Sequence, residues 1–140
     1  MVEGCDPNTA LTRRPRVLLA EDHPLVQQVI HNIVGGRCDV VGLVTNSDEV
    51  LESACRLLPD VIVLDISLSG QSAMQLLPHL RAALPDTAIV MLTTLTQPVY
   101  RVEALARGAD AFVVKGRAMT DLLPAIGEAL ATARLQRRRA

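Results

Sequence analysis

Residues 60–67 read Asp-Val-Ile-Val-Leu-Asp-Ile-Ser, so that four apolar residues stand between two carboxylates. A short apolar run rich in β-branched residues predicts a strand buried on both faces of a parallel sheet. Asp65 then lies at the carboxyl end of that strand, where open α/β sheets place their binding sites. The alternative interpretation is an ordinary aspartate that ends a strand and starts a turn. The rest of the chain decides between the two.

Short apolar strands and helical patterns alternate along the remaining sequence. Five repeats of strand then helix, joined by short loops, predict a single doubly wound α/β domain with a parallel sheet and helices on both faces. The expected strands are 17–20, 40–44, 61–64, 88–92 and 111–114, and the expected helices are 24–34, 47–58, 72–84, 98–107 and a last one from about 120.

Several local features of these helices are also predicted. Ser47 is a suitable N-cap, and Gly108 suits a left-handed cap. Pro78 predicts that its helix either starts late or kinks, whereas Pro124 is tolerated if it lies in a first turn. Two apolar sets are expected to face inward: Leu25, Val26, Val29, Ile30, Ile33 and Val34 in the first helix, and Val50, Leu51, Ala54, Leu57 and Leu58 in the second.

Composition narrows the class of protein. The 140 residues have a net charge of -1, 1% aromatic residues and no Trp, which argues against direct binding of nucleic acid. Cys5, Cys38 and Cys55 form no C-x-x-C pair, and no long apolar segment is present, so we expect a cytoplasmic chain that does not enter a membrane. We divide it into a flexible leader (1–15), a folded domain (16–134) and a basic end or start of a linker (135–140).

Polar residues follow four of the five strands. Parallel strands end at the same edge of a sheet, so Glu21, Asp22, Asp65, Thr93 and Lys115 are expected to meet there. Gathered carboxylates repel one another unless a cation joins them, and hard oxygen ligands suit Mg²⁺, with Mn²⁺ as a substitute. A nucleophilic carboxylate, a metal, a lysine and a hydroxyl are the groups that phosphoryl transfer to an aspartate needs.

The stretches that carry these residues resemble a known family. Residues 17–24, 60–65, 90–93 and 107–115 are similar to the receiver domain of two-component response regulators, the CheY-like fold, and most like the NarL/FixJ (LuxR-type) receivers. The resemblance implies a flavodoxin-like sheet in the order 2-1-3-4-5. It also implies a phosphorylation-controlled signalling switch rather than an enzyme, with a histidine kinase or phosphotransfer protein as its partner.

The resemblance also implies a role for each site residue. Asp65 would be the phosphoacceptor, and Asp22 and the Ser67 carbonyl would join it in binding Mg²⁺, with Glu21 acting through a water on the ion. Lys115 and Thr93 would contact the phosphoryl group. Thr93 and Phe112 would form the switch that reshapes the surface of the fourth helix, fifth strand and fifth helix. That surface, or the one formed by the first and fifth helices, would serve a homodimer.

Departures from the usual receiver pattern include Gly116, where many receivers carry Pro, and Thr94, which is bulkier than the residue common beside the switch threonine. Three more positions concern the loop after Asp65 and the helix that follows it. Ser69 stands where such receivers usually carry Pro, Ala73 stands where they carry Gly, and Pro78 falls inside the third helix. None of the three removes a group that the chemistry needs.

Two classes of enzyme share this order of strands and helices. A haloacid-dehalogenase phosphatase needs an aspartate at position 67, and a Rossmann domain needs a G-x-G-x-x-G turn after the first strand; both are missing. The remaining alternatives are a receiver whose DNA-binding domain lies outside this chain, a stand-alone receiver that acts by protein contacts, and a receiver that no longer uses phosphate.

Overall fold

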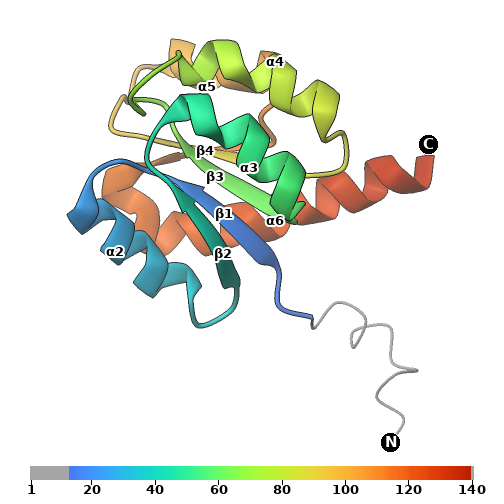
Figure 1. The fold of residues 1–140 in the computed structure, drawn as a ribbon, viewed down its shortest axis with the longest axis horizontal. Helices are drawn as coiled ribbons and strands as arrows, with labels where there is room; N and C mark the ends of the chain where they lie inside the picture. Colours follow the sequence, from blue (N-terminus) through green and yellow to red (C-terminus); the bar gives the residue numbers. More distant parts are fainter. Residues whose placement is uncertain (1–12, 140) are drawn as a thin grey trace, which may run out of the picture.

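The computed structural model describes residues 13–139, with side chains described as far as residue 133. Within these residues the chain forms a five-stranded parallel sheet in the order β2-β1-β3-β4-β5 (Figure 1). The predicted doubly wound fold and the order 2-1-3-4-5 are therefore confirmed. The strands are β1 (Arg16–Ala20), β2 (Asp39–Val44), β3 (Val61–Asp65), β4 (Ala88–Thr93) and β5 (Ala111–Val114).

Helices cover both faces of this sheet (Figure 1). The helices of the described region are α2 (Pro24–Val34), α3 (Val50–Leu57), α4 (Ala73–Ala83), α5 (Pro98–Ala106) and α6 (Ala118–Arg139), with short 3₁₀ turns η2 (Ser47–Glu49) and η3 (Lys115–Arg117). The helices α3, α4 and α5 pack on one face, while α2 and α6 pack on the other.

Alternation along β3 divides the core between the two faces. Ile62 and Leu64 join the core under α3, α4 and α5, whereas Val61 and Val63 join the core under α2 and α6. All four side chains are fully buried. Burial of each such side chain stabilises the fold by about 1.5–3 kcal/mol, so the opening stretch anchors both cores.

The helix α2 has the predicted bounds, but its apolar stripe is narrower than expected. Ile30 and Val34 are buried, whereas Leu25 is 68% exposed and Val29 is 48% exposed. The prediction that Leu25 and Val29 face the core is therefore wrong. Since successive residues turn by about 100°, six apolar residues cover a wider arc than one sheet face can contact.

The start of α3 also differs from the prediction. Ser47 is not an N-cap but the first residue of η2, which Asn46 caps by accepting a hydrogen bond from the Asp48 amide at 2.8 Å. The turn η2 leads into α3, whose N-cap Glu49 makes no side-chain hydrogen bond. At the other end, Leu58 takes a left-handed φ of 49° and is 62% exposed, so its expected inward position is wrong. A residue that closes a helix in this conformation points away from the face of the preceding turns.

Pro78 lies inside α4 without delaying its start. The helix begins at Ala73, after the N-cap Ser72, so the late start is excluded. Proline has no amide hydrogen to donate to the carbonyl four residues earlier, which here belongs to Met74. Arg107 Nη1 donates to that Met74 carbonyl at 3.4 Å. A side chain at the end of α5 thus supplies a donor where α4 lacks one.

The helix α6 begins at Ala118, earlier than the predicted start near Thr120, because η3 leads directly into it. Pro124 consequently lies in the second turn of α6, and the prediction that it lies in the first turn is wrong. The carbonyl that loses its amide partner belongs to Thr120, which is exposed, so water can satisfy it.

Arg13 and Arg14 belong to the expected leader and contact the folded domain; residues 1–12 of that leader lie outside the described residues. Arg13 pairs with Asp60 at 3.0 Å. Arg14 pairs with Asp39 at 2.7 Å and also donates to the carbonyl of Gly35, at the end of α2. A guanidinium is favoured there because the end of a helix carries partial negative charge.

Arg81 ties the end of α4 to the turn before β5. Its guanidinium donates to the Gly108 carbonyl at 2.8 Å, to the Thr87 carbonyl at 2.8 Å and to Asp110 at 2.6 Å. Gly108 has a φ of 121°, which confirms its predicted left-handed cap. Asp110 also accepts from the Ile89 amide at 2.8 Å, so this side chain fixes the start of strand β4 as well.

Two further observations concern the chain as a whole. Among residues 13–139, none of the helices combines the length and apolar character that a bilayer-spanning segment requires. Cys38 and Cys55 are free thiols, and burial raises the pKa of the Cys38 thiol.

Candidate functional site

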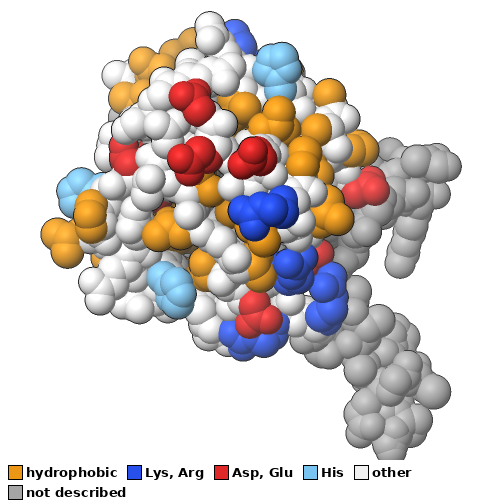
Figure 2. All heavy atoms as spheres, in the orientation of Figure 1, with side chains coloured by type: hydrophobic (Ala, Val, Ile, Leu, Met, Phe, Trp, Pro, Cys, Tyr) orange, Lys and Arg blue, Asp and Glu red, His pale blue; other side chains and the backbone are white. Residues whose placement is uncertain are grey.

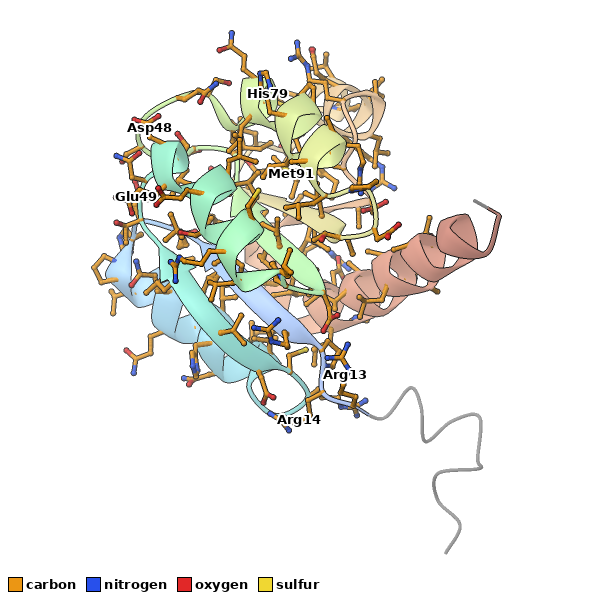
Figure 3. The ribbon with its side chains drawn as sticks, turned by 45° about the vertical axis from the view of Figure 1, so that its right-hand side comes forward. Arg13, Arg14, Asp48, Glu49, His79 and Met91 are labelled. Atoms are coloured by element: carbon orange, nitrogen blue, oxygen red, sulfur yellow. The ribbon has the colours of Figure 1, made fainter. Side chains whose placement is uncertain are left out.

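The predicted site lies at the carboxyl edge of the sheet. Asp65 is the last residue of β3, Thr93 is the last residue of β4, Glu21 and Asp22 directly follow β1, and Lys115 directly follows β5. Figure 2 shows acidic side chains gathered towards the upper left and most Lys and Arg side chains towards the lower right. Figure 3 agrees, with Asp48 and Glu49 at one end of the molecule and Arg13 and Arg14 at the other.

Lys115 joins two buried carboxylates from different strands. Its Nζ lies 2.9 Å from Glu21 Oε1 and 3.1 Å from Asp65 Oδ2. Glu21 is fully buried, Asp65 is 1% exposed, and the Lys115 side chain is 17% exposed. Burial alone would lower the pKa of Lys115, but the two carboxylates outweigh it, and the pKa lies above its usual value. Lys115 therefore stays protonated at neutral pH.

Glu21 is held at a fixed position but is not fully satisfied. Its Oε2 accepts from the His23 amide at 3.0 Å, and its own amide donates to the Val44 carbonyl at 2.9 Å. The contact of Oε1 with Lys115 lacks the angles of a hydrogen bond, so among the described residues this buried oxygen has no hydrogen-bond partner. Buried polar atoms without partners are uncommon and call for a ligand, an ion or water.

Asp22 lies at the mouth of the same group. One oxygen from each of Glu21, Asp22 and Asp65 lies within 4.8 Å of the other two. The Ser69 hydroxyl donates to Asp22 Oδ2 at 2.6 Å, and it is the main reason that the pKa of Asp22 lies below its usual range.

The charges of this group leave room for a divalent cation. Three carboxylates against one ammonium leave two negative charges at one strand edge. Hard carboxylate oxygens are the ligands that Mg²⁺ prefers, usually with several waters retained. The oxygen set, the excess charge and the Oε1 of Glu21, which accepts no hydrogen bond from a described residue, thus fit such an ion.

The loop between β3 and α4 is fixed by the loop between β2 and α3. The Ser67 amide donates to Asp65 Oδ1 at 3.0 Å, which orients that carboxylate. The Ser47 amide donates to the Ser69 carbonyl at 2.7 Å, and the Ser47 hydroxyl donates to the Gln71 carbonyl. Gly70 has a φ of 100°, and a Cβ atom there would lie 2.6 Å from Asn46 Oδ1.

Thr93 and Phe112 lie on the β4–β5 side of the site. Thr93 is fully buried, and its Oγ1 accepts from the Leu95 amide at 3.0 Å. Thr93 pairs in register with Val114, the residue before Lys115. Phe112 is half-buried against the core under α3, α4 and α5.

Residues 17–127 match the family model of the response regulator receiver domain. This chain belongs to that family. It is similar to the nitrate/nitrite response regulator NarL of Escherichia coli K12, with 32% identity over 117 residues that cover 82% of this chain and 54% of NarL. It is also similar to the transcriptional regulatory protein YxjL of Bacillus subtilis, with 31% identity over 79% of this chain and 52% of YxjL. The chain spans about half the length of these relatives.

Solved structures agree with this assignment. The response regulator domain of Thermotoga maritima CheB superposes with a TM-score of 0.78 at 27% identity, covering 85% of this chain and 98% of that one. The BeF3-activated receiver domain of Klebsiella pneumoniae RstA gives a TM-score of 0.76 at 30% identity, covering 82% and 97%. The predicted NarL-like receiver is confirmed, and the chain is a signalling domain and not a classical enzyme.

The sequence did not indicate the support that surrounds the acidic group. Ser69 appeared only as a departure from the receiver pattern, and its contact with Asp22 joins residues 47 positions apart. The contacts of Ser47 with the loop were also not predicted, since they join residues 22 and 24 positions apart. Gly70 was the one local sign of a tight turn there.

Proposed function

We propose that this receiver is a phosphorylation-controlled switch in which Asp65 accepts a phosphoryl group from a histidine kinase or phosphotransfer protein. The observation that carries the proposal is the pairing of Lys115 with both Glu21 and Asp65, at 2.9 and 3.1 Å, beside the exposed edge where Asp22 lies. This arrangement places an ammonium against two buried carboxylates, next to a site of excess negative charge.

In the transfer step, an oxygen of Asp65 attacks the phosphorus of a phosphohistidine. The P–N bond breaks, its electron pair stays with the imidazole nitrogen, and that nitrogen takes up a proton. Lys115 moves its charge from the carboxylates towards the phosphoryl oxygens, and the Thr93 hydroxyl donates to another of them. Water then hydrolyses the acyl phosphate, which restores the Asp65 carboxylate and releases inorganic phosphate. In this proposal the residues of the site assist both the phosphorylation and the dephosphorylation of Asp65.

Asp22, Asp65 and the Ser67 carbonyl would hold a Mg²⁺ or Mn²⁺ ion, with Glu21 contacting it through water. When bound, the ion draws charge from the phosphoryl oxygens. The chain's own residues orient the carboxylates: the Ser67 amide donates to Asp65, and the His23 amide donates to Glu21.

Output would follow from a rearrangement on the β4–β5 side. Thr93 would leave its contact with the Leu95 amide to bind the phosphoryl group, and Phe112 would turn further inward. New contacts with the phosphoryl group would bias a two-state element. The surface of α5, β5 and α6 would change as a result, and this surface or that of α2 and α6 would serve a homodimer.

We infer that the output is transcription, through a DNA-binding domain outside this chain, as in the relative named transcriptional regulatory protein YxjL. The alternative is a stand-alone receiver that acts by protein contacts in the cytoplasm. The mass of the natural gene product separates the two, because a protein as long as these relatives would be roughly one and a half times as long as this chain.

The phosphoacceptor is tested by incubating the chain with Mg²⁺ and acetyl phosphate and measuring intact mass. We expect the native chain to gain the mass of one phosphoryl group, and the gain to disappear with a chelator or in Asp65→Asn. Asp86→Asn is the matched control, since Asp86 is an exposed aspartate in the turn after α4. A native chain without the gain, or an undiminished gain in Asp65→Asn, would contradict the proposal.

A further inference from the structure

Ser69 makes a contact that the proposed chemistry does not by itself require. Its hydroxyl donates to Asp22 Oδ2 at 2.6 Å, a distance typical of a charge-assisted hydrogen bond between a hydroxyl and a carboxylate. The two residues come from different strand ends, β3 for Ser69 and β1 for Asp22. The bond therefore links the loop that follows Asp65 to the most exposed of the three carboxylates.

The position of Ser69 is fixed from a second side. Its carbonyl accepts from the Ser47 amide at 2.7 Å, and Asn46 and Ser69 form a parallel β-bridge. Ser47 is 1% exposed and also donates its hydroxyl to the Gln71 carbonyl. The Ser69 hydroxyl is thus presented to Asp22 from a backbone that the β2–α3 loop holds in place.

An exposed aspartate without such a donor samples several rotamers, and ordering it on binding a cation costs free energy. A hydroxyl that already fixes the carboxylate removes part of that cost. A carboxylate has about four acceptor positions, so one hydrogen bond leaves the others for an ion. Donors behind a ligating carboxylate commonly change metal affinity by about 10–100-fold.

We propose that Ser69 is a positioning residue that holds Asp22 ready for a divalent cation. The inference rests on the proposed function, because it assumes that Asp22 is a ligand. It predicts the direction in which cation affinity changes when the hydroxyl is removed. If the hydroxyl orients Asp22, its removal weakens cation binding. If the hydroxyl only competed with the ion for Asp22, its removal would strengthen cation binding.

The test measures binding of Mn²⁺ to the full chain. Binding is monitored by the loss of the electron paramagnetic resonance signal of the free ion. We expect Ser69→Ala to raise the dissociation constant for Mn²⁺ by roughly tenfold, at the lower end of the range for such donors. Ser69→Thr keeps the hydroxyl and should stay close to the native chain. Ser72→Ala is the matched control, because the Ser72 hydroxyl caps α4 by accepting from the Gln75 amide.

A second readout separates positioning from a loss of structure. With acetyl phosphate, Ser69→Ala should react more slowly at low Mg²⁺ and approach the native rate at saturating Mg²⁺, because the cation then orders Asp22 itself. A misfolded variant would react slowly at every Mg²⁺ concentration. In that case the affinity of Ser69→Thr for Mn²⁺ tests the proposal, because this variant keeps the hydroxyl and should bind like the native chain.

The outcomes distinguish this inference from the proposed function. If Asp22→Asn loses Mn²⁺ affinity but Ser69→Ala binds as well as or better than the native chain, only the role of Ser69 is overturned. If the native chain does not bind Mn²⁺, or if Asp22→Asn binds it as well, both the cation site and the role of Ser69 are overturned.

Discussion

Replacement of Lys115 by methionine tests the electrostatics of the site directly. Methionine keeps most of the apolar stem and removes the ammonium that lies 2.9 Å from Glu21 and 3.1 Å from Asp65. Both carboxylates are almost completely buried. The variant therefore leaves two buried negative charges side by side, with a third carboxylate, that of Asp22, close by.

The magnitude follows from the burial of these groups. Removing one partner of a buried ion pair typically costs about 3–5 kcal/mol. Lys115 is 17% exposed and Asp22 opens to solvent, so water and salt cations offset part of the loss. We expect Lys115→Met to lower the free energy of unfolding by about 3 kcal/mol at neutral pH. In urea this lowers the midpoint by about 1–2 M.

The assay is urea denaturation followed by far-UV circular dichroism, because the chain has no Trp. A chelator excludes divalent cations from the comparison. The double variant Lys115→Met with Asp65→Asn should recover about half of the loss, since one of the two buried charges is gone. Arg117→Met is the matched control: its side chain is 70% exposed and pairs with Asp121 at the surface, so we expect a much smaller cost than that of Lys115→Met.

Two results would contradict this reasoning. A Lys115→Met midpoint equal to that of the native chain would mean that the buried carboxylates do not need the ammonium. A double variant no more stable than Lys115→Met would mean that the loss comes from packing and not from charge.

Three further predictions concern stability. Because the pKa of Lys115 is raised in the folded chain, its pairing stabilises the fold at pH values below 10.5, the pKa of the unfolded chain. This stabilisation is lost as the pH rises through the pKa of the folded chain. In urea titrations, the difference in free energy of unfolding between the native chain and Lys115→Met should therefore shrink at alkaline pH. Arg81→Met should lower the free energy of unfolding by about 2–3 kcal/mol in urea titrations, because it leaves the nearly buried Asp110 carboxylate without its cation. Arg101 is exposed, so Arg101→Met should change stability little. Equal midpoints for the two variants would contradict a stabilising role for the contacts of Arg81. Gly70→Ala should lower the free energy of unfolding by about 1–3 kcal/mol and with it the melting temperature. The reason is that a φ of 100° is strained for a residue with a side chain, and the added Cβ would lie 2.6 Å from Asn46 Oδ1. An unchanged melting temperature would show that the loop relaxes freely.

The fold could be predicted because its signals are local. Strands such as β5 and helices such as α2 have the predicted bounds, since each is a short apolar run or a 3.6-residue period between clear stops. The charged site residues could be predicted too, because a parallel sheet places every strand end at one edge. Burial was less predictable: Leu25 and Leu58 are as apolar as their buried neighbours, and only the packed sheet leaves them exposed.

The support of the site could not be predicted, because it depends on contacts between distant residues. Nothing near Ser69 indicates that it meets Asp22, and nothing near Ser47 indicates that it fixes the loop around Gln71. Such partners are set by the register of β1, β2 and β3, which the local sequence does not encode.

The departures at Ser69 and Pro78 have a common physical interpretation. Each changes the hydrogen-bonding groups available after β3, and in each case a residue from another element completes the pairing. Ser69 adds a donor that Asp22 accepts, and Pro78 removes a donor whose carbonyl partner, that of Met74, accepts from Arg107 instead. The Met74 carbonyl is partly buried and needs a donor, which Arg107 supplies, whereas the bond between Ser69 and Asp22 is exposed to solvent. The segment from Asp65 to the end of α4 is therefore tied to β1 at one end and to α5 at the other, and any movement of α5 on phosphorylation would act on the contact between Arg107 and Met74.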